Sequence, residues 1–239
     1  MENISNYDKI ASHYDIFNTD FNYSDYFSVI KNNLSSFKNP FGDKIALDCG
    51  CGTGSLIKHL LKEGFICTGV DISPDMLAIA KSKKELEDVQ FICQNLSDID
   101  LYRAYNLVIC SLDTVNHITE KIKLKSFFKK IYNFIEPKGF FIFDVKTEKG
   151  FKKNIKTEIY KEKENMLIYE GFYIKPYMEY ILTTFSEVED NCFIKNETSI
   201  EERFYSDKEI YKMLSISKLK YIKKINYKDR KIYIYRKVL

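Results

Sequence analysis

Three glycines lie within five residues, at Gly50, Gly52 and Gly54, just after a short apolar run. When a strand turns into a helix through such glycines, the main chain can approach a ligand closely, and the free N–H groups of the helix start point at it. Asp71 follows Gly50 by 21 residues and stands at the end of the next apolar run. A doubly wound fold places a carboxylate at this interval to hold ribose hydroxyls. The spacing predicts a nucleotide-binding turn, with a plain tight turn as the alternative.

The positions of the glycines also indicate what kind of nucleotide the turn binds. A dinucleotide fingerprint requires a glycine at position 55, where this chain has Ser55. Asp48 stands just before the loop, and a carboxylate there would repel a pyrophosphate. The same carboxylate suits a ligand that carries an ammonium or a sulfonium group. We therefore expect a cationic cofactor.

The elements that must position these residues are visible as apolar runs that alternate with segments of helical period. The predicted strands cover residues 44–47, 65–70, 89–93, 106–110 and 139–143, and the predicted helices cover residues 53–63, 74–84 and 118–135. Pro74 behind Ser73 is typical of a capped helix start. The alternation predicts an α/β fold with a doubly wound, mainly parallel sheet that helices cover on both faces.

The last part of the chain has a different pattern. Residues 155–205 are rich in Tyr, Phe, Ile and Thr. These stretches are interrupted at three places, which are Gly171, 175–176 and 189–191. Such spacing predicts an inserted antiparallel β lobe. A capping-box pattern then predicts a short helix over 206–214, and a closing hairpin is expected over 221–238.

Three segments together resemble the class I S-adenosylmethionine-dependent methyltransferases, in the branch of small-molecule enzymes. D-C-G-C-G-T-G at 48–54 is similar to the family's motif I, G-V-D-I-S-P-D-M-L at 69–77 to its post-I segment, and E-P-K-G-F-F-I-F-D at 136–144 to its strand-five motif. The resemblance implies a seven-stranded Rossmann-like sheet with a reversed last strand. It further implies a single methyltransferase domain over 1–239, in which the inserted β lobe at 155–205 covers the substrate.

The resemblance implies S-adenosylmethionine as the cofactor. Gly50 and Gly52 would pass beneath its methionine part, and Asp71 would hold its ribose. The remaining cofactor contacts that the resemblance implies are Tyr14, Asp48, Ile72, Met76, Asn95, Leu96 and Cys110. Asn95 stands where the family usually has aspartate, and its side-chain oxygen would accept from the adenine amino group.

Residues 111–117 follow the fourth predicted strand, so they should face the transferred methyl group. His117 is the one histidine of three in this segment, and it would act as a general base or, as the tyrosine often found there in the family suggests, as a positioning group. Asp113 and Asn116 would orient the acceptor or cap the next helix. Tyr14 would contact the methionine end of the cofactor, or it would serve only as an apolar anchor of an amphipathic helix.

Composition excludes several other classes of protein. With 239 residues, of which 45% are hydrophobic and 30% charged, the chain is ordinary globular material rather than a disordered or repetitive one. The net charge of +3 is no nucleic-acid signature, and no apolar run is long enough to span a membrane. Six cysteines form no second ligand pair for zinc, so no metal site is expected. The absence of a leader-like start favours a reduced, cytoplasmic location.

These observations predict an enzyme that transfers a methyl group from S-adenosylmethionine to a nitrogen or oxygen of a small metabolite. One alternative is an RNA (tRNA or rRNA) methyltransferase, motivated by the lysines over 218–231, although the cysteine and proline motifs of nucleic-acid methyltransferases are missing. The other alternative is a catalytically silent subunit that only binds S-adenosylmethionine. The acceptor, the need for a general base, and the choice between monomer and homodimer stay open.

Overall fold

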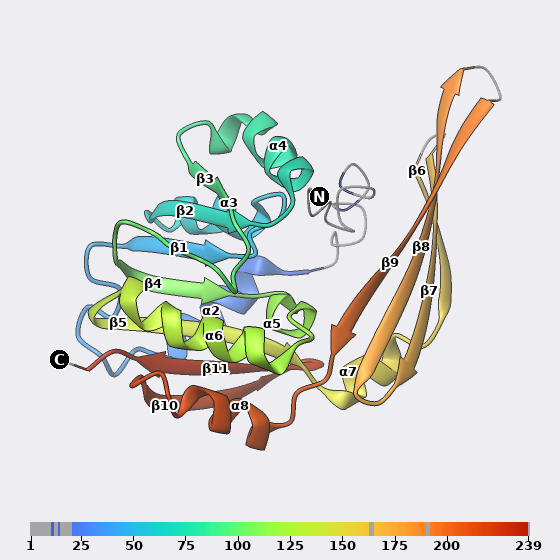
Figure 1. The fold of residues 1–239 in the computed structure, drawn as a ribbon. Coiled ribbons are helices and arrows are strands. Elements are labelled where there is room, and N and C mark those ends of the chain that lie inside the picture. The colour runs from blue at the N-terminus through green and yellow to red at the C-terminus, as the bar shows by residue number, and fades with distance from the viewer. Residues whose placement is uncertain (1–10, 12–13, 15–20, 163–164, 190–191, 239) are drawn as a thin grey trace.

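The computed structural model describes residues 11, 14, 21–162, 165–189 and 192–238. The main sheet consists of β1 (Ile45–Cys49), β2 (Ile66–Asp71), β3 (Gln90–Cys93), β4 (Tyr105–Cys110), β5 (Ile135–Lys146), β10 (Lys220–Tyr227) and β11 (Arg230–Arg236). Their order in space is β10-β11-β5-β4-β1-β2-β3 (Figure 1). Pairs among β1 to β5 are parallel, whereas β11 runs antiparallel to β5 and to β10. The predicted doubly wound, mainly parallel seven-stranded α/β sheet is confirmed.

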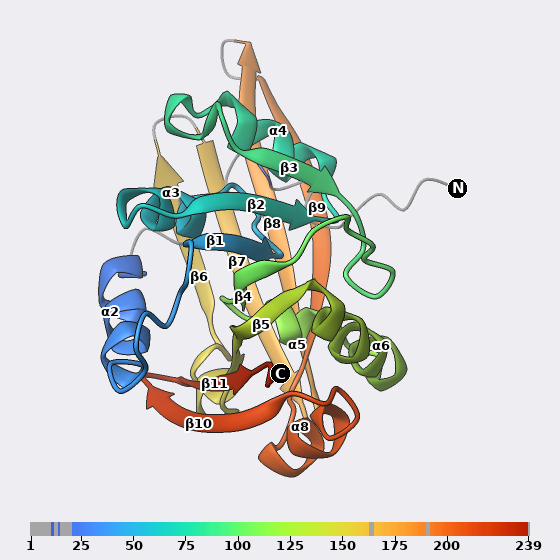
Figure 2. The same ribbon diagram turned by 90° about the vertical axis from the view of Figure 1, so that its left-hand side faces the viewer.

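Helices cover both faces of this sheet (Figure 2). The first face carries α2 (Tyr23–Asn33), α3 (Ser55–Lys62) and α4 (Pro74–Ser82), and the second carries α6 (Lys121–Ile131) and α8 (Asp207–Leu214). β5 shows why both faces need cover, because Phe140 and Ile142 enter the first core while Phe141 and Phe143 enter the second. No helix in the described ranges is both long enough and apolar enough to cross a membrane.

Two helix starts follow the predicted capping chemistry. The Ser73 hydroxyl accepts from the Met76 N–H ahead of α4, and Ser206 and Glu209 form a reciprocal capping box at α8. The helix predicted over 118–135 is too long, because α6 ends at Ile131 and Ile135 already pairs with Tyr105 as the first residue of β5. This pairing places Ile135 in the strand, and Pro137 favours an extended backbone at Glu136, the residue before it.

The predicted β lobe corresponds to a separate four-stranded antiparallel sheet, which follows α7 (Glu148–Lys153). Its strands are β6 (Thr157–Glu162), β7 (Asn165–Ile174), β8 (Tyr177–Glu189) and β9 (Cys192–Arg203). The interruption predicted at Gly171 is wrong, because Gly171 lies inside β7. A Cβ atom there would lie 2.0 Å from the Asn154 carbonyl oxygen, so this glycine permits a close backbone approach. The lobe stands beyond the carboxyl ends of the parallel strands (Figure 1).

Candidate active site

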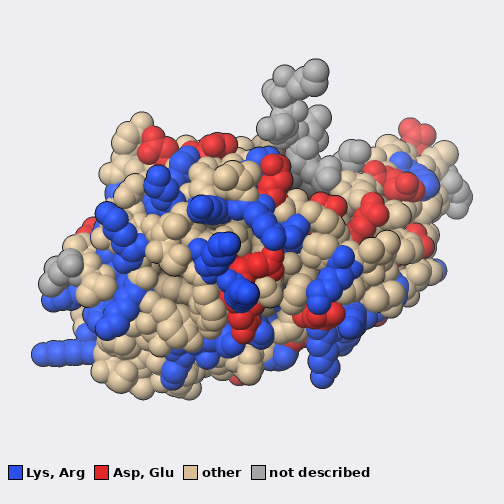
Figure 3. Space-filling view, turned by 60° about the horizontal axis from the view of Figure 1, so that its bottom comes forward, with Lys and Arg blue, Asp and Glu red and all other residues tan. Residues whose placement is uncertain are grey.

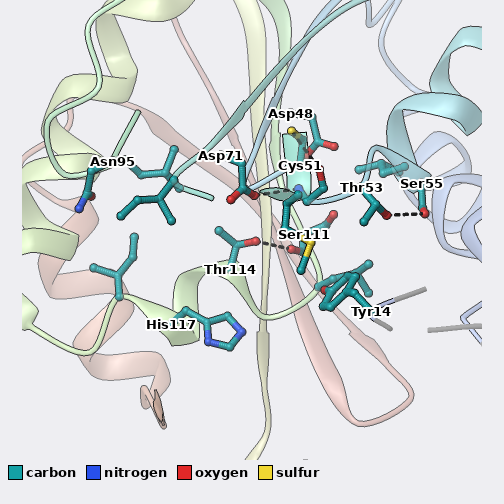
Figure 4. Close-up of a pocket in the computed structure, with 18 of the residues that line it drawn as sticks. Tyr14, Asp48, Cys51, Thr53, Ser55, Asp71, Asn95, Ser111, Thr114 and His117 are labelled. Carbon is teal, nitrogen blue, oxygen red and sulfur yellow. Dashed lines mark hydrogen bonds between the residues drawn. The ribbon is translucent and has the colours of Figure 1, made fainter. Parts of the chain in front are cut away.

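A cavity of about 290 Å³ lies at the carboxyl ends of β1, β2 and β4 (Figure 4). The predicted cofactor residues that line it are Tyr14, Asp48, Gly50, Gly52, Asp71, Ile72, Met76, Asn95 and Leu96. Cys110 is fully buried and does not line the cavity, whereas the next residue, Ser111, does. The geometry therefore brings nine of the ten residues that were predicted to contact a cofactor to one cavity and leaves Cys110 outside its lining.

The glycine turn begins with the main chain in the left-handed region, where glycine is the residue without strain. Gly50 has a φ of 75°, and a Cβ atom there would lie 2.3 Å from the Thr114 side chain. Gly52 has a φ of 51°, but a Cβ atom there would meet nothing nearer than the Tyr14 ring, at 3.8 Å. Gly50 thus packs against α5 (Thr114–His117), while Gly52 faces the space under Tyr14.

Asp71 is bonded to the turn that it was predicted to face. Its two carboxylate oxygens accept from the Gly52 N–H at 2.8 Å and from the Ser73 N–H at 2.9 Å. A carboxylate offers about four lone-pair sites, so two backbone donors leave acceptor capacity for a ligand. Burial raises the pKa of Asp71, although these backbone donors act to lower it.

Asp48 is 2% exposed and lies close to Asp71 at the end of β1. Burial, and after it the charge of Asp71, raises the pKa of Asp48 to about 8. Asp48 and Asp71 lie together near the glycine turn in the upper part of Figure 4, so a cation bound beside them would favour the ionised form of both carboxyl groups. This arrangement fits the expected ammonium or sulfonium.

Asn95 departs from its predicted use. Its side-chain oxygen accepts from both the N–H and the hydroxyl of Ser97, each at 2.9 Å. The oxygen that was expected to accept from an adenine amino group is therefore already used within the turn after β3. The NH₂ group is the part of the side chain that this arrangement leaves for a ligand.

A second cavity of about 420 Å³ lies between the first one and the β lobe. Tyr14, Leu112 and His117 line both cavities. The lobe contributes the aromatic side chains of Tyr160, Tyr169 and Tyr180 to the second cavity, while Phe172 and Tyr177 on the same lobe are largely exposed. His117 therefore occupies the junction at which a group in one cavity would meet a group in the other.

Charged side chains form a buried cluster along the second cavity. Asp113 pairs with Lys146 at 3.0 Å and with Arg230 at 3.1 Å, and Arg230 also pairs with Asp144 at 3.0 Å. Burial alone would raise the pKa of Asp113, but the two cations hold it at about 2. Burial acts to lower the pKa of Lys146, yet Asp113 and Glu202 keep it well above its usual value.

Two of the predicted catalytic residues have other partners than expected. Asp113 stands at the N-cap position of α5 with a φ of 68°, but its side chain makes no capping hydrogen bond and joins the ionic cluster. Asn116 is fully buried and lines neither cavity. Its side-chain NH₂ group donates to the backbone carbonyl of Arg203 at 2.8 Å, and its side-chain oxygen accepts from the backbone N–H of Lys146 at 3.0 Å. Asn116 therefore ties β5 to β9 instead of orienting an acceptor or capping a helix.

Sequence reasoning missed Lys146, Glu202 and Arg230. The sequence could have indicated Arg230 as a buried ion-pair residue, because the chain holds only four arginines beside 33 lysines and arginine is the better partner in a buried ion pair. Glu202 had no such signal, since its partner Lys146 is 56 residues away in the chain. The lobe must fold onto the sheet before these groups meet.

Residues 46–139 match the family model described as a methyltransferase domain, and they contain all of β1 but its first residue, the glycine turn, Asp71 and His117. A solved S-adenosylmethionine-dependent methyltransferase from Clostridium acetobutylicum ATCC 824 matches 98% of this chain and 100% of its own, with a TM-score of 0.81 and 24% identity. Residues 46–139 thus match a methyltransferase domain, and the chain shares the fold of a solved S-adenosylmethionine-dependent methyltransferase. This match supports the resemblance drawn from the motifs.

Other proteins to which this chain is similar have varied names. The sugar N-methyltransferase KedS8 from Streptoalloteichus sp. ATCC 53650 shares the fold, with a TM-score of 0.78 at 15% identity over 95% of this chain and 93% of its own. A Geobacillus sp. (strain WCH70) protein whose name, methyltransferase, gives no substrate is 35% identical over 58% of this chain and 57% of its own length. A malonyl-[acyl-carrier protein] O-methyltransferase from Bacillus anthracis is 23% identical over 69% of this chain and 50% of its own length. The chain thus spans about half the length of such curated relatives.

Proposed function

We propose that this chain is an enzyme that transfers a methyl group from S-adenosylmethionine in the first cavity to a nitrogen or oxygen of a small molecule in the second. The observation that carries the proposal is the junction of the two cavities at Tyr14, Leu112 and His117. Methyl transfer needs two reactants held in line, and two adjoining cavities with a shared wall supply that register.

The residues of the first cavity fit the cofactor chemically. Asp71 keeps lone pairs for the two ribose hydroxyls, and a nearby Asp48 carboxylate stabilises positive charge on the methionine part. The Asn95 NH₂ group would donate to a ring nitrogen of adenine, in place of the acceptor role that the family resemblance implies. Ile72 and Met76 supply apolar wall on either side of that ring.

When bound, S-adenosylmethionine supplies an electrophilic methyl group on a sulfonium. Asp71, Asp48 and the glycine turn would hold it so that its methyl group could pass to a lone pair of the acceptor nitrogen or oxygen, with the neutral thioether as the leaving group. His117 would position the acceptor at the junction or would accept its proton, which otherwise goes to solvent. Tyr14 and Leu112, which line both cavities, would help to keep the acceptor in line with the methyl group.

The size of the second cavity and the names of similar proteins favour a small acceptor. The relatives include a dTDP-3-amino-3,6-dideoxy-alpha-D-glucopyranose N,N-dimethyltransferase from Streptomyces fradiae, 28% identical over 39% of this chain and 36% of its own length. Three of the six lysines over 218–231 that motivated an RNA substrate have polar protein partners: Lys224 and Lys231 pair with Asp207, and Lys223 donates to Asn33. On the face in Figure 3, basic side chains are interrupted by acidic and uncharged ones instead of forming a continuous band.

Calorimetry with S-adenosylmethionine tests the first half of the proposal. We expect micromolar binding, and we expect Asp71→Ala to weaken it about 10-fold or more, because each lost charge-assisted hydrogen bond contributes ~1.5–3 kcal/mol. A protein that binds no S-adenosylmethionine would sink the proposal.

A screen of amines, amino sugars and hydroxylated metabolites for S-adenosylhomocysteine release tests the second half. Release with a small acceptor supports the proposal. Binding of the cofactor without release from any acceptor would point to the silent subunit, and salt-dependent association with RNA accompanied by RNA methylation would point to the RNA enzyme.

A further inference from the structure

Glu202 brings a carboxylate from the last strand of the lobe to the active-site histidine. Its side chain is 4% exposed, and its Oε1 atom lies 3.4 Å from Nε2 of His117. The same carboxylate accepts from Lys146 at 2.8 Å and 3.2 Å and from the Tyr180 hydroxyl at 3.1 Å. Glu202 thus touches the junction residue without lining the cofactor cavity itself.

Lys146 holds this carboxylate in place. An ammonium group has three N–H donors, and Nζ of Lys146 has three acceptors in reach: Asp113 at 3.0 Å, Glu202 at 2.8 Å and the Tyr180 hydroxyl at 2.9 Å. These partners come from the loop after β4, from β9 and from β8. Because all three donors are used, Lys146 serves as a fixed hub and not as a base or a nucleophile.

We propose that Glu202 and Lys146 are positioning residues that act through His117. The Glu202 carboxylate accepts from Nε2–H of the imidazole, which selects that tautomer and fixes the plane of the ring, and Lys146 fixes the carboxylate. This inference rests on the proposed function only for its catalytic consequence. The proposed role of Glu202 makes the lobe part of the catalytic machinery, because the position of β9 relative to the main sheet determines the orientation of the imidazole at the junction.

The competing explanation is that the buried cluster only attaches the lobe to the sheet. Two variants separate these roles. Glu202→Gln keeps the shape of the side chain but removes the charge, and Lys146→Met/Glu202→Met replaces the buried ion pair by apolar groups, which proteins often tolerate. Glu201→Gln is the matched control, because Glu201 neighbours Glu202 on β9 but is exposed.

The first readout needs neither cofactor nor acceptor. The chain has three histidines, so ¹⁵N-labelled histidine gives a small set of signals, and a His117→Asn spectrum assigns the one that matters. We expect the Nε2–H tautomer of His117 in the wild-type protein and in Glu201→Gln. We expect a mixture of tautomers in Glu202→Gln and in the double variant, with circular dichroism unchanged.

The second readout is kinetic. We expect kcat to fall about 10- to 100-fold in both variants, as for other groups that orient a functional histidine, with the affinity for S-adenosylmethionine kept within about threefold. An unchanged His117 tautomer, full kcat in the folded double variant, or loss of fold in both variants would overturn the positioning role. A wild-type protein that shows the tautomer but binds no cofactor would instead sink the proposed function alone.

Discussion

Cofactor binding should release a proton from Asp48. Its carboxyl has a pKa of about 8 in the ligand-free protein, so about 90% of it is protonated at pH 7. A positive charge placed beside this carboxyl favours its ionised form. If the cofactor lowers the pKa of Asp48 by about 2, binding releases about 0.8 proton at pH 7 and about 0.1 proton at pH 9.

The same linkage makes the affinity depend on pH. The ionised carboxylate attracts the cofactor and the protonated one does not, so the affinity should rise by about 100-fold, or ~2.7 kcal/mol, from pH 5 to pH 9. Asp48→Asn is the matched variant, because it keeps the shape of the side chain but cannot ionise. At pH 5 the two proteins should bind with similar affinity, and at pH 9 the wild-type protein should bind more tightly.

Titration calorimetry in buffers of different ionisation enthalpy measures the released protons directly. The cofactor's own amino group also titrates in this range, so the decisive quantity is the difference between the wild-type protein and Asp48→Asn. Equal proton release by the two proteins at pH 7, or equal affinity at pH 9, would refute the assignment of this proton to Asp48.

Three further predictions concern stability and the turn. Gly50→Ala should lower the free energy of unfolding by ~1–3 kcal/mol in a denaturant titration, because its Cβ atom would overlap Thr114. Gly52→Ala should lower the free energy of unfolding less but weaken cofactor binding. The reverse ranking would contradict the roles assigned to these glycines. The pKa of Asp113 is lowered to about 2, so its contribution of ~2–3 kcal/mol to the free energy of unfolding is present above pH 4 and is lost as the pH falls toward 2. In a plot of the free energy of unfolding against pH, Asp113→Asn should therefore fall less steeply at acid pH than the wild-type protein. An unchanged acid slope would contradict the ion pairs. Ser206→Ala should lower the melting temperature by a few degrees through loss of ~1 kcal/mol at α8, and no change in a thermal scan would contradict the capping box.

The turn and the parallel part of the fold followed from the sequence because their signals are local. Three glycines and one aspartate within 22 residues are contained in a single strand–turn–helix–strand unit, so their chemistry needed no knowledge of distant segments. The boundary error at residues 118–135 has the opposite origin. Ile135 fits the apolar period of the helix, and only its pairing with Tyr105 places it in a strand.

The sequence by itself determined the cofactor class, the doubly wound, mainly parallel sheet and the carboxyl-end placement of His117. Only the tertiary structure decided what surrounds His117. Lys146, Glu202 and Arg230 lie on three strands far apart in the chain, and their charges are stable in a buried cluster only because the lobe and the closing hairpin meet there. No local pattern encodes that meeting, since ion pairs between distant segments leave no period in the sequence. The second cavity, and with it the acceptor, depends on this packing.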